Sequence, residues 1–91
     1  MAKRIVVLGG GISGVGAAVL AKKKGFEVFV SDQAKISDDH KRVLLNNHIE
    51  WEEHQHTYEQ ILNADEIIKS PGISYKTDLI QRLLTTEIPI I

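Results

Sequence analysis

The sequence predicts an α/β fold in which a doubly wound, five-stranded parallel sheet carries helices on both faces. Apolar runs of strand length alternate with helical segments along the 91 residues. Strands that alternate with helices in this way pair in parallel through right-handed crossovers. A glycine-rich turn at residues 9–14 joins the first apolar run to the first helical segment. Because this length is that of one domain, we expect residues 1–91 to form a single unit.

Five segments have the length and composition of β-strands. The first, Arg4–Leu8, is continuous and rich in β-branched residues, as expected for a strand that is buried on both faces. The last contains Pro89, which cannot donate to a neighbouring strand, so we expect this segment at an edge. The winding predicts the strand order 3-2-1-4-5, with a crevice between the first and fourth strands. The remaining segments are Glu27–Ser31, 49–52, Glu66–Lys69 and, at the end, 88–91.

The first two helical segments have recognisable starts and stops. Residues 13–24 are rich in alanine and glycine and end in three lysines before Gly25, which is a basic last turn followed by a glycine stop. The second helix is expected to begin at Ser37 and to bury Val43 and Leu44. Small residues in the first helix predict that it lies close against the sheet.

Two further helices are predicted in the second half of the chain. Thr57 and Gln60 have the spacing of a capping box, which indicates a helix that begins there. In residues 77–85, leucine and isoleucine recur at spacings of three and four, which predicts one buried helical face.

Composition and charge exclude several classes of function. The chain has no cysteine, which excludes a disulfide framework and a thiol nucleophile. Its net charge is −1, so we expect no nucleic-acid partner. No apolar stretch approaches the ~20 residues of a membrane span and no secretory pattern is present, so we expect a cytoplasmic protein without membrane contact. The apolar run at 88–91 predicts that a longer protein continues beyond it.

The turn after the first strand has the pattern G-x-G-x-x-G, at Gly9, Gly11 and Gly14. Between a strand and a helix this pattern predicts a diphosphate site in a Rossmann-like fold. Gly9 permits the tight turn, Gly11 lets a phosphate reach the backbone, and Gly14 lets helix and strand approach closely. The N–H groups of Ile12, Ser13 and Gly14 then face the anion at the positive end of the helix dipole.

Two further segments follow strands and complete the candidate site. Asp32 follows the second strand, where an acid in dinucleotide-binding folds accepts hydrogen bonds from ribose hydroxyls. The alternative is that its carboxylate only caps the next segment. Ser70, Pro71, Gly72 and Ile73 follow the fourth strand and are expected to face the glycine loop across the crevice. There Ser70 offers a hydroxyl and Gly72 an open N–H to a nucleoside.

Together these three motifs resemble the Mur ligases over the whole chain, as the first domain of a three-domain enzyme. Within that family the Ser-Pro-Gly-Ile turn is most similar to the branch that adds D-glutamate to UDP-N-acetylmuramoyl-L-alanine in bacterial peptidoglycan synthesis. The resemblance implies that this domain binds the UDP part of that substrate. It assigns the diphosphate to Gly11, Ile12, Ser13 and Gly14, the uracil to Asp32, Gln33 and Ala34, and the other side of the nucleoside to Ser70, Pro71, Gly72 and Ile73.

The resemblance also implies the chemistry of the full-length enzyme. ATP, with Mg²⁺, phosphorylates the substrate carboxylate, and the amine of D-glutamate attacks the acyl phosphate. A P-loop for ATP needs a Gly-Lys pair, which this chain lacks. We therefore expect no catalytic residue, cofactor or activity in residues 1–91, and we expect ATP and Mg²⁺ on the remaining ligase domains in cis.

Two other interpretations remain open from the sequence. The glycine pattern and Asp32 equally permit an NAD-binding domain of an oxidoreductase or sensor protein, and the glycines could instead serve packing alone. His54 and His56 lie beside two glutamates and resemble a small metal cluster. Two histidines without a third placed ligand fall short of a zinc site, so we expect a solvated edge and no bound metal.

Overall fold

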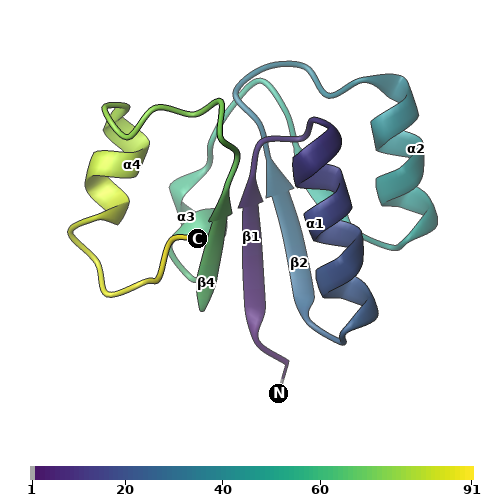
Figure 1. Ribbon diagram of the computed structural model, residues 1–91, viewed down its shortest axis with the longest axis horizontal. Helices are drawn as coiled ribbons and strands as arrows, with labels where there is room; N and C mark the ends of the chain where they lie inside the picture. The colour runs from purple at the N-terminus through teal and green to yellow at the C-terminus, as the bar shows by residue number, and fades with distance from the viewer. Residues whose placement is uncertain (1) are drawn as a thin grey trace.

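The computed structural model describes residues 2–91, in which four parallel strands alternate with four helices. Helices lie on both faces of one sheet (Figure 1), which confirms the doubly wound α/β prediction. The elements in chain order are β1 (Arg4–Leu8), α1 (Ile12–Lys23), β2 (Glu27–Ser31), α2 (Asp38–Asn46), β3 (Glu50–Glu52), α3 (Tyr58–Ile61), β4 (Glu66–Lys69) and α4 (Asp78–Leu83).

The sheet has the strand order β3-β2-β1-β4, so β1 is central. Val6 of β1 pairs in parallel with Phe29 of β2 on one side and with Ile67 of β4 on the other. The chain winds outward from β1 to β3 and then returns across β1 to form β4. The direction of winding therefore reverses between β1 and β4, as predicted, and a crevice is expected at the carboxyl ends of these strands.

The predicted fifth strand is wrong as a full strand, although its place in the order is correct. Within residues 2–91, Ile90 forms an isolated parallel bridge with Ile67 beside β4. The Ile91 N–H donates to the Ile67 carbonyl at 2.8 Å, and the Ile67 N–H donates to the Pro89 carbonyl at 2.9 Å. The Lys69 N–H also donates to the Ile91 carbonyl at 2.9 Å, whereas Pro89 has no N–H to extend the pairing toward the start of β4.

The pleat of β1 divides the core into two layers. Ile5 and Val7 face α1 and α2, whereas Val6 and Leu8 face α3 and α4. Successive side chains of a strand point to opposite faces, so a strand that is covered on both faces is apolar throughout. This accounts for the uninterrupted apolar run in the sequence.

The helix boundaries agree with the predicted signals in part. After α1, Gly25 adopts φ +93°, and the Ser37 hydroxyl accepts a hydrogen bond from the His40 N–H at 3.2 Å at the start of α2. Val43, predicted to be buried, is 39% exposed, because Leu44 is the α2 side chain that enters the core. The predicted capping box at Thr57 is also wrong: its hydroxyl donates to the Glu52 carboxylate at 2.5 Å instead of capping α3.

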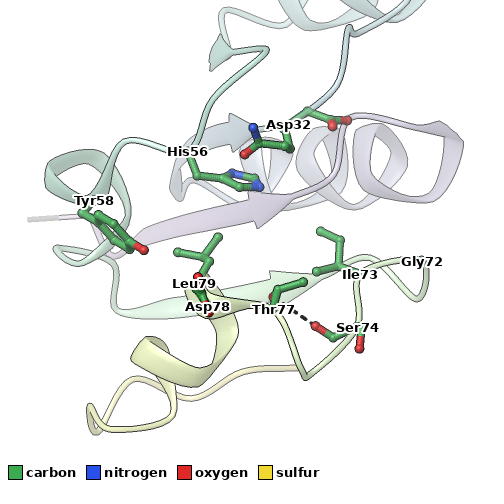
Figure 2. Close-up of a pocket in the computed structure, with 10 residues that line it drawn as sticks. Asp32, His56, Tyr58, Gly72, Ile73, Ser74, Thr77, Asp78 and Leu79 are labelled. Atoms are coloured by element: carbon green, nitrogen blue, oxygen red, sulfur yellow. Dashed lines mark hydrogen bonds between the residues drawn. The ribbon is translucent and has the colours of Figure 1, made fainter.

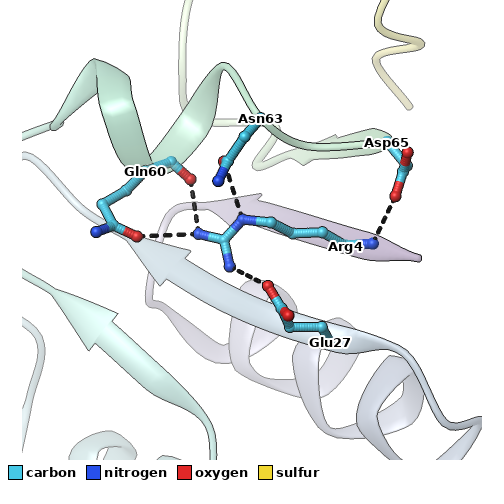
Figure 3. A network of polar contacts seen from close by, with 5 residues as sticks. All are labelled: Arg4, Glu27, Gln60, Asn63 and Asp65. Carbon is cyan, nitrogen blue, oxygen red and sulfur yellow. Dashed lines mark hydrogen bonds and ion pairs between the residues drawn. The ribbon is translucent and has the colours of Figure 1, made fainter. Parts of the chain in front are cut away.

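Arg4, the first residue of β1, is at the centre of a network of polar contacts that joins β1 to β2, to α3 and to the loop before β4 (Figure 3). Its guanidinium contacts the Glu27 carboxylate of β2 at 2.5 Å and the Gln60 carbonyl of α3 at 2.7 Å. It also donates to the Asn63 side chain at 3.0 Å, and the Arg4 backbone N–H donates to Asp65 at 2.7 Å. Arginine suits this position because its planar guanidinium group holds several N–H donors in fixed directions. This network stabilises the scaffold rather than the candidate site.

Candidate functional site

The glycine loop is closely packed against its neighbours. Gly9 has φ +107°, a conformation that side chains disfavour, and its N–H donates to the Ser31 carbonyl at 2.8 Å. A Cβ on Gly9 would lie 2.7 Å from the Ser70 Cβ, and a Cβ on Gly14 would lie 1.8 Å from the Gly9 carbonyl oxygen. These two glycines are therefore required by the close approach of the loop, the helix and the turn after β4.

Gly11 has different surroundings. A Cβ on it would meet nothing within 4 Å, so the packing of the described residues gives no reason for glycine at this position. Gly11 is the N-cap of α1, and among residues 2–91 no side chain caps the first turn. The first N–H groups of a helix have no acceptor within the helix. Ile12 and Ser13 begin α1, and Ile12 is 83% exposed. The amino-terminal end of α1 is thus open toward solvent.

Asp32 fastens the glycine loop. Its Oδ2 accepts from the Gly10 N–H at 2.7 Å and its Oδ1 accepts from the Ala34 N–H at 2.9 Å. These hydrogen bonds are those of the alternative interpretation, in which the carboxylate caps the next segment, and the ribose contact stays a prediction. Each oxygen keeps a further lone pair that could accept a ribose hydroxyl.

Lys69 holds the turn after β4. Its ammonium group donates to the Ser70 carbonyl at 3.0 Å and to the Ile73 carbonyl at 2.7 Å, and it lies 4.6 Å from the centre of the Tyr75 ring. The Ser70 N–H donates to the Leu8 carbonyl at 2.9 Å, which ties the turn to the end of β1. The Ser-Pro-Gly-Ile turn is thereby fixed beside the glycine loop.

A cavity of about 540 Å³ opens between the ends of the strands and α4. This volume lies within the range of small-molecule sites. Figure 2 shows Asp32 and His56 on one side of it, and Ile73 and Leu79 across from them. The residues that line it are Asp32, Gln33, His56, Tyr58, Gly72, Ile73, Ser74, Thr77, Asp78 and Leu79.

The structure brings together some of the predicted site residues and leaves others outside the cavity wall. Asp32 and Gln33 after β2 share the cavity with Gly72 and Ile73 after β4. Residues 11–14 directly follow Gly10, whose N–H donates to the cavity residue Asp32. Seven of the eleven predicted residues do not line the cavity: Gly11, Ile12, Ser13, Gly14, Ala34, Ser70 and Pro71. Ser70 instead lies against the glycine loop, as the Gly9 geometry shows.

A polar cluster lies behind the cavity. The Ser31 side chain, which is 0% exposed, is 2.7 Å from His56 Nδ1 and donates to Glu52 Oε2 at 2.8 Å. The same carboxylate accepts from the Thr57 N–H at 2.8 Å. These contacts join the end of β2 to the segment that follows β3.

Burial and hydrogen bonding shift two pKa values in this cluster. Burial alone would raise the pKa of the Glu52 carboxyl, but the hydrogen bonds from Thr57 and Ser31 and the nearby His56 outweigh it and hold the pKa below its usual value. Burial lowers the pKa of the His56 imidazole, and the carboxylates of Glu52 and Asp32 offset this only in part. At neutral pH the cluster therefore contains an ionised Glu52 and a neutral His56.

The two histidines of the apparent metal cluster have separate environments. His54 is exposed, with φ +62°, and its Nε2 lies 3.9 Å from Glu53 Oε1. His56 lines the cavity. The expectation of a solvated edge is thus correct for His54 and wrong for His56, because the segment after β3 turns back over the end of β2.

Sequence reasoning missed six residues that line the cavity: His56, Tyr58, Ser74, Thr77, Asp78 and Leu79. One signal was available for His56, since it follows the third strand and the carboxyl ends of all parallel strands meet at one edge. The residues from 74 to 79 carry no such signal. Their place depends on how α4 packs against the sheet.

The central β1, the glycine loop and the cavity at the point where the winding reverses define a domain of the Rossmann-like class. Within this class the chain belongs to the family of MurD N-terminal domains, whose family model matches residues 4–79.

Known relatives agree with this assignment. The chain is 60% identical over 89 residues to the UDP-N-acetylmuramoylalanine–D-glutamate ligase of Bacteroides thetaiotaomicron, covering 98% of the chain and 20% of that enzyme. It is 50% identical over 91 residues to the ligase of the same name from Christiangramia forsetii, covering 100% of the chain and 20% of the enzyme. The chain therefore spans about a fifth of the length of these relatives.

Solved structures show the same architecture. The crystal structure of UDP-N-acetylmuramate:L-alanyl-gamma-D-glutamyl-meso-diaminopimelate ligase from Neisseria meningitides matches all of this chain and 28% of its own, with a TM-score of 0.83 and 26% identity. The comparisons support the ligase interpretation and not the oxidoreductase alternative. Within residues 2–91 no helix has the length and apolar character required to cross a membrane.

Proposed function

We propose that this chain is the domain that binds the UDP part of UDP-N-acetylmuramoyl-L-alanine in a ligase that adds D-glutamate. The observation that carries the proposal is the open amino-terminal end of α1 beside a cavity at the switch point of the sheet. Unpaired helix N–H groups and the positive end of the helix dipole favour a diphosphate there. The names of the curated relatives support the identity of the substrate.

In this proposal the diphosphate contacts the backbone at Gly11, Ile12, Ser13 and Gly14. The absence of any packing reason for glycine at position 11 supports close approach of a ligand. The nucleoside occupies the cavity, between Asp32 and Gln33 on one side and Gly72 and Ile73 on the other. Ala34, Ser70 and Pro71, which lie outside the cavity wall, shape the two turns that present these residues.

The proposal assigns no catalytic residue to this chain. ATP and Mg²⁺ are expected on domains beyond residues 1–91, in the same cytoplasmic enzyme, because this segment contains no Gly-Lys pair for a P-loop. We therefore expect the 91-residue chain, supplied with ATP, Mg²⁺, substrate and D-glutamate, to release no ADP. Release of ADP in that mixture would contradict this part of the proposal.

An NMR titration of the labelled chain with UDP, NAD and ATP separately tests the binding function. We expect UDP to shift the amides of residues 11–14, Ser70 and Gly72. Stronger shifts with NAD at the same amides would favour the oxidoreductase alternative, and no shift with any of the three would favour a purely structural role.

A matched pair of variants localises the diphosphate. Gly11→Val places a side chain where the phosphate would lie, so we expect UDP binding to be lost with the fold retained. Gly16→Val makes the same change on α1 where a Cβ also meets nothing within 4 Å, and there UDP binding should be unchanged. Equal UDP affinity in both variants would contradict the loop assignment.

A further inference from the structure

The polar cluster behind the cavity has no part in the proposed diphosphate contacts. Ser31 is completely buried and polar, and it connects the Glu52 carboxylate to His56, which lines the cavity. Buried polar groups are costly unless they are hydrogen-bonded, so a cluster of this kind fixes its members in one arrangement. The group that it fixes at the cavity is the imidazole of His56.

The hydrogen bonds define which nitrogen of His56 carries the proton. Glu52 is ionised and can only accept, so the single proton of the Ser31 hydroxyl is directed to Glu52 Oε2 at 2.8 Å. The Gln55 carbonyl, 3.3 Å from the same hydroxyl, is also only an acceptor. The 2.7 Å contact between Ser31 Oγ and His56 Nδ1 is then a hydrogen bond only if Nδ1 donates. In the neutral ring, Nε2 is therefore unprotonated and is an acceptor.

The ring of His56 extends into the cavity, opposite the apolar side chains of Ile73 and Leu79 (Figure 2). Among residues 2–91, the hydrogen bonding of the His56 side chain is through Nδ1. The cavity of about 540 Å³ has room for a base that stands between these two walls with its polar edge toward the imidazole. Uracil presents an N–H donor at N3 of that edge, whereas cytosine has an acceptor at N3.

We infer that His56 accepts a hydrogen bond at Nε2 from the N3–H group of uracil, and that Ser31 and Glu52 act as positioning residues that hold its tautomer. This inference rests on the proposed function and extends it to the choice of base. The wild-type chain then prefers UDP to CDP, because an acceptor facing the N3 acceptor of cytosine leaves both without a partner.

Binding of UDP, CDP and 2′-deoxy-UDP by the 91-residue chain, measured by NMR titration, tests the inference. We expect the wild-type chain to bind UDP about tenfold more tightly than CDP. The ratio of UDP to 2′-deoxy-UDP affinity should be the same in the wild type and in His56→Asn, because the ribose contact belongs to Asp32. His56→Asn keeps a donor for Ser31 but removes the Nε2 acceptor, so the preference for UDP should fall to about twofold or less. His56→Gln restores an acceptor near the position of Nε2 and should recover part of the preference.

His54→Asn is the matched control, because His54 is exposed, outside the cavity wall, and has a positive φ that asparagine tolerates. We expect it to bind UDP and CDP as the wild type does. The amide spectrum of each variant shows whether the fold is retained. If His56→Asn does not fold, two other variants test the inference. His56→Gln should retain the preference for UDP over CDP, and Ser31→Ala, which removes the hydroxyl that holds the tautomer of His56, should lose it.

Acidification gives an independent readout. Protonated Nε2 is a donor, so UDP affinity in the wild type should fall as the pH drops below the lowered pKa of the His56 imidazole, and much less in His56→Gln. The other titratable groups around the ring are Asp32 after β2, Glu52 of β3, Tyr58 of α3 and Asp78 of α4. Because all four are present in both proteins, the difference between the two profiles isolates His56.

The outcomes separate this inference from the proposed function. Equal binding of UDP and CDP by the wild type, or an unchanged preference in His56→Asn, overturns the role of His56 and leaves UDP binding intact. A loss of affinity for 2′-deoxy-UDP that disappears in His56→Asn also overturns it, because His56 would then face the ribose, whereas a loss that persists in this variant reports the ribose contact of Asp32. No binding of UDP at all would instead overturn the proposed function, and this inference with it.

Discussion

Gly14 is the position where a single methyl group should do most damage. It lies in the first turn of α1, and a Cβ there would be 1.8 Å from the Gly9 carbonyl oxygen and 2.9 Å from the Gly9 carbonyl carbon. Real Cβ contacts essentially never fall below 3.0 Å, and both neighbours are backbone atoms. Gly14→Ala therefore forces α1 away from the loop by about 1 Å, which disturbs the packing of α1 on β1.

The expected magnitude follows from two opposing effects. Overpacking of a closely fitted site costs about 1–3 kcal/mol and occasionally more, and a backbone clash lies at the upper end of that range. Replacing glycine by alanine in a helix contributes about 1 kcal/mol in the opposite direction. We expect a net loss of about 2 kcal/mol or more in the free energy of unfolding. With a urea m-value of about 1 kcal/mol/M, the unfolding midpoint should fall by about 2 M.

Gly16→Ala is the control for this prediction. Gly16 is exposed on the same helix, and a Cβ there meets nothing within 4 Å. In this variant alanine has the higher helix propensity and its Cβ meets no neighbouring atom, so the midpoint of urea unfolding should rise by about 0.5–1 M. Urea unfolding followed by circular dichroism measures both. If the midpoint of Gly14→Ala lies within 0.5 M of the wild type, the argument from close approach is refuted.

Three further predictions concern the scaffold and the cluster behind the cavity. Arg4→Ala should lower the free energy of unfolding by about 2–3 kcal/mol, and Arg4→Lys by about half as much, because lysine keeps the charge but lacks the planar set of N–H donors. Urea unfolding measures both, and equal losses in the two variants would contradict this. The His56 pKa is lowered on folding, so its stabilisation is complete above about pH 6.5 and is lost on acidification. The lowered Glu52 pKa adds a second loss below about pH 4.5, and only the first should disappear from the pH profile of His56→Asn. Lys69→Met keeps the apolar stem but removes two hydrogen bonds to the turn after β4, so the amides of that turn should exchange hydrogen about tenfold faster while those of β2 stay unchanged.

Much of the fold could be predicted from the sequence because its signals are local. The apolar run of β1 reflects burial on both faces, and the stop at Gly25 reflects a positive φ that glycine adopts freely. The errors occurred where a tertiary contact competed with a local signal. The Thr57 hydroxyl could have capped the start of α3, but it donates instead to the ionised Glu52 carboxylate at 2.5 Å, because a charged acceptor makes the stronger hydrogen bond.

The candidate site divides in the same way. The glycine loop, Asp32 and the turn at Ser70 each follow a strand, and in a parallel sheet the carboxyl ends of the strands must meet at one edge. The sequence alone was therefore sufficient to bring these segments together, and the diphosphate that it predicts beside α1 stays a prediction. It did not show that Asp32 uses both carboxylate oxygens to hold backbone N–H groups of the loop and its own turn.

The alternation of strands and helices and the spacing of the glycines are properties of the chain itself, since they depend on backbone geometry over a few residues. The cavity wall formed by α4, the place of His56 in it and the state of its ring depend on side chains that are distant in the sequence. Because Ser31 is buried beside Glu52, its hydroxyl proton is directed to the Glu52 carboxylate. Nδ1 of His56 must then donate to Ser31, and Nε2 is the nitrogen that faces the cavity as an acceptor. Such an arrangement arises only when the segments pack, because solvent would otherwise satisfy each of these groups separately.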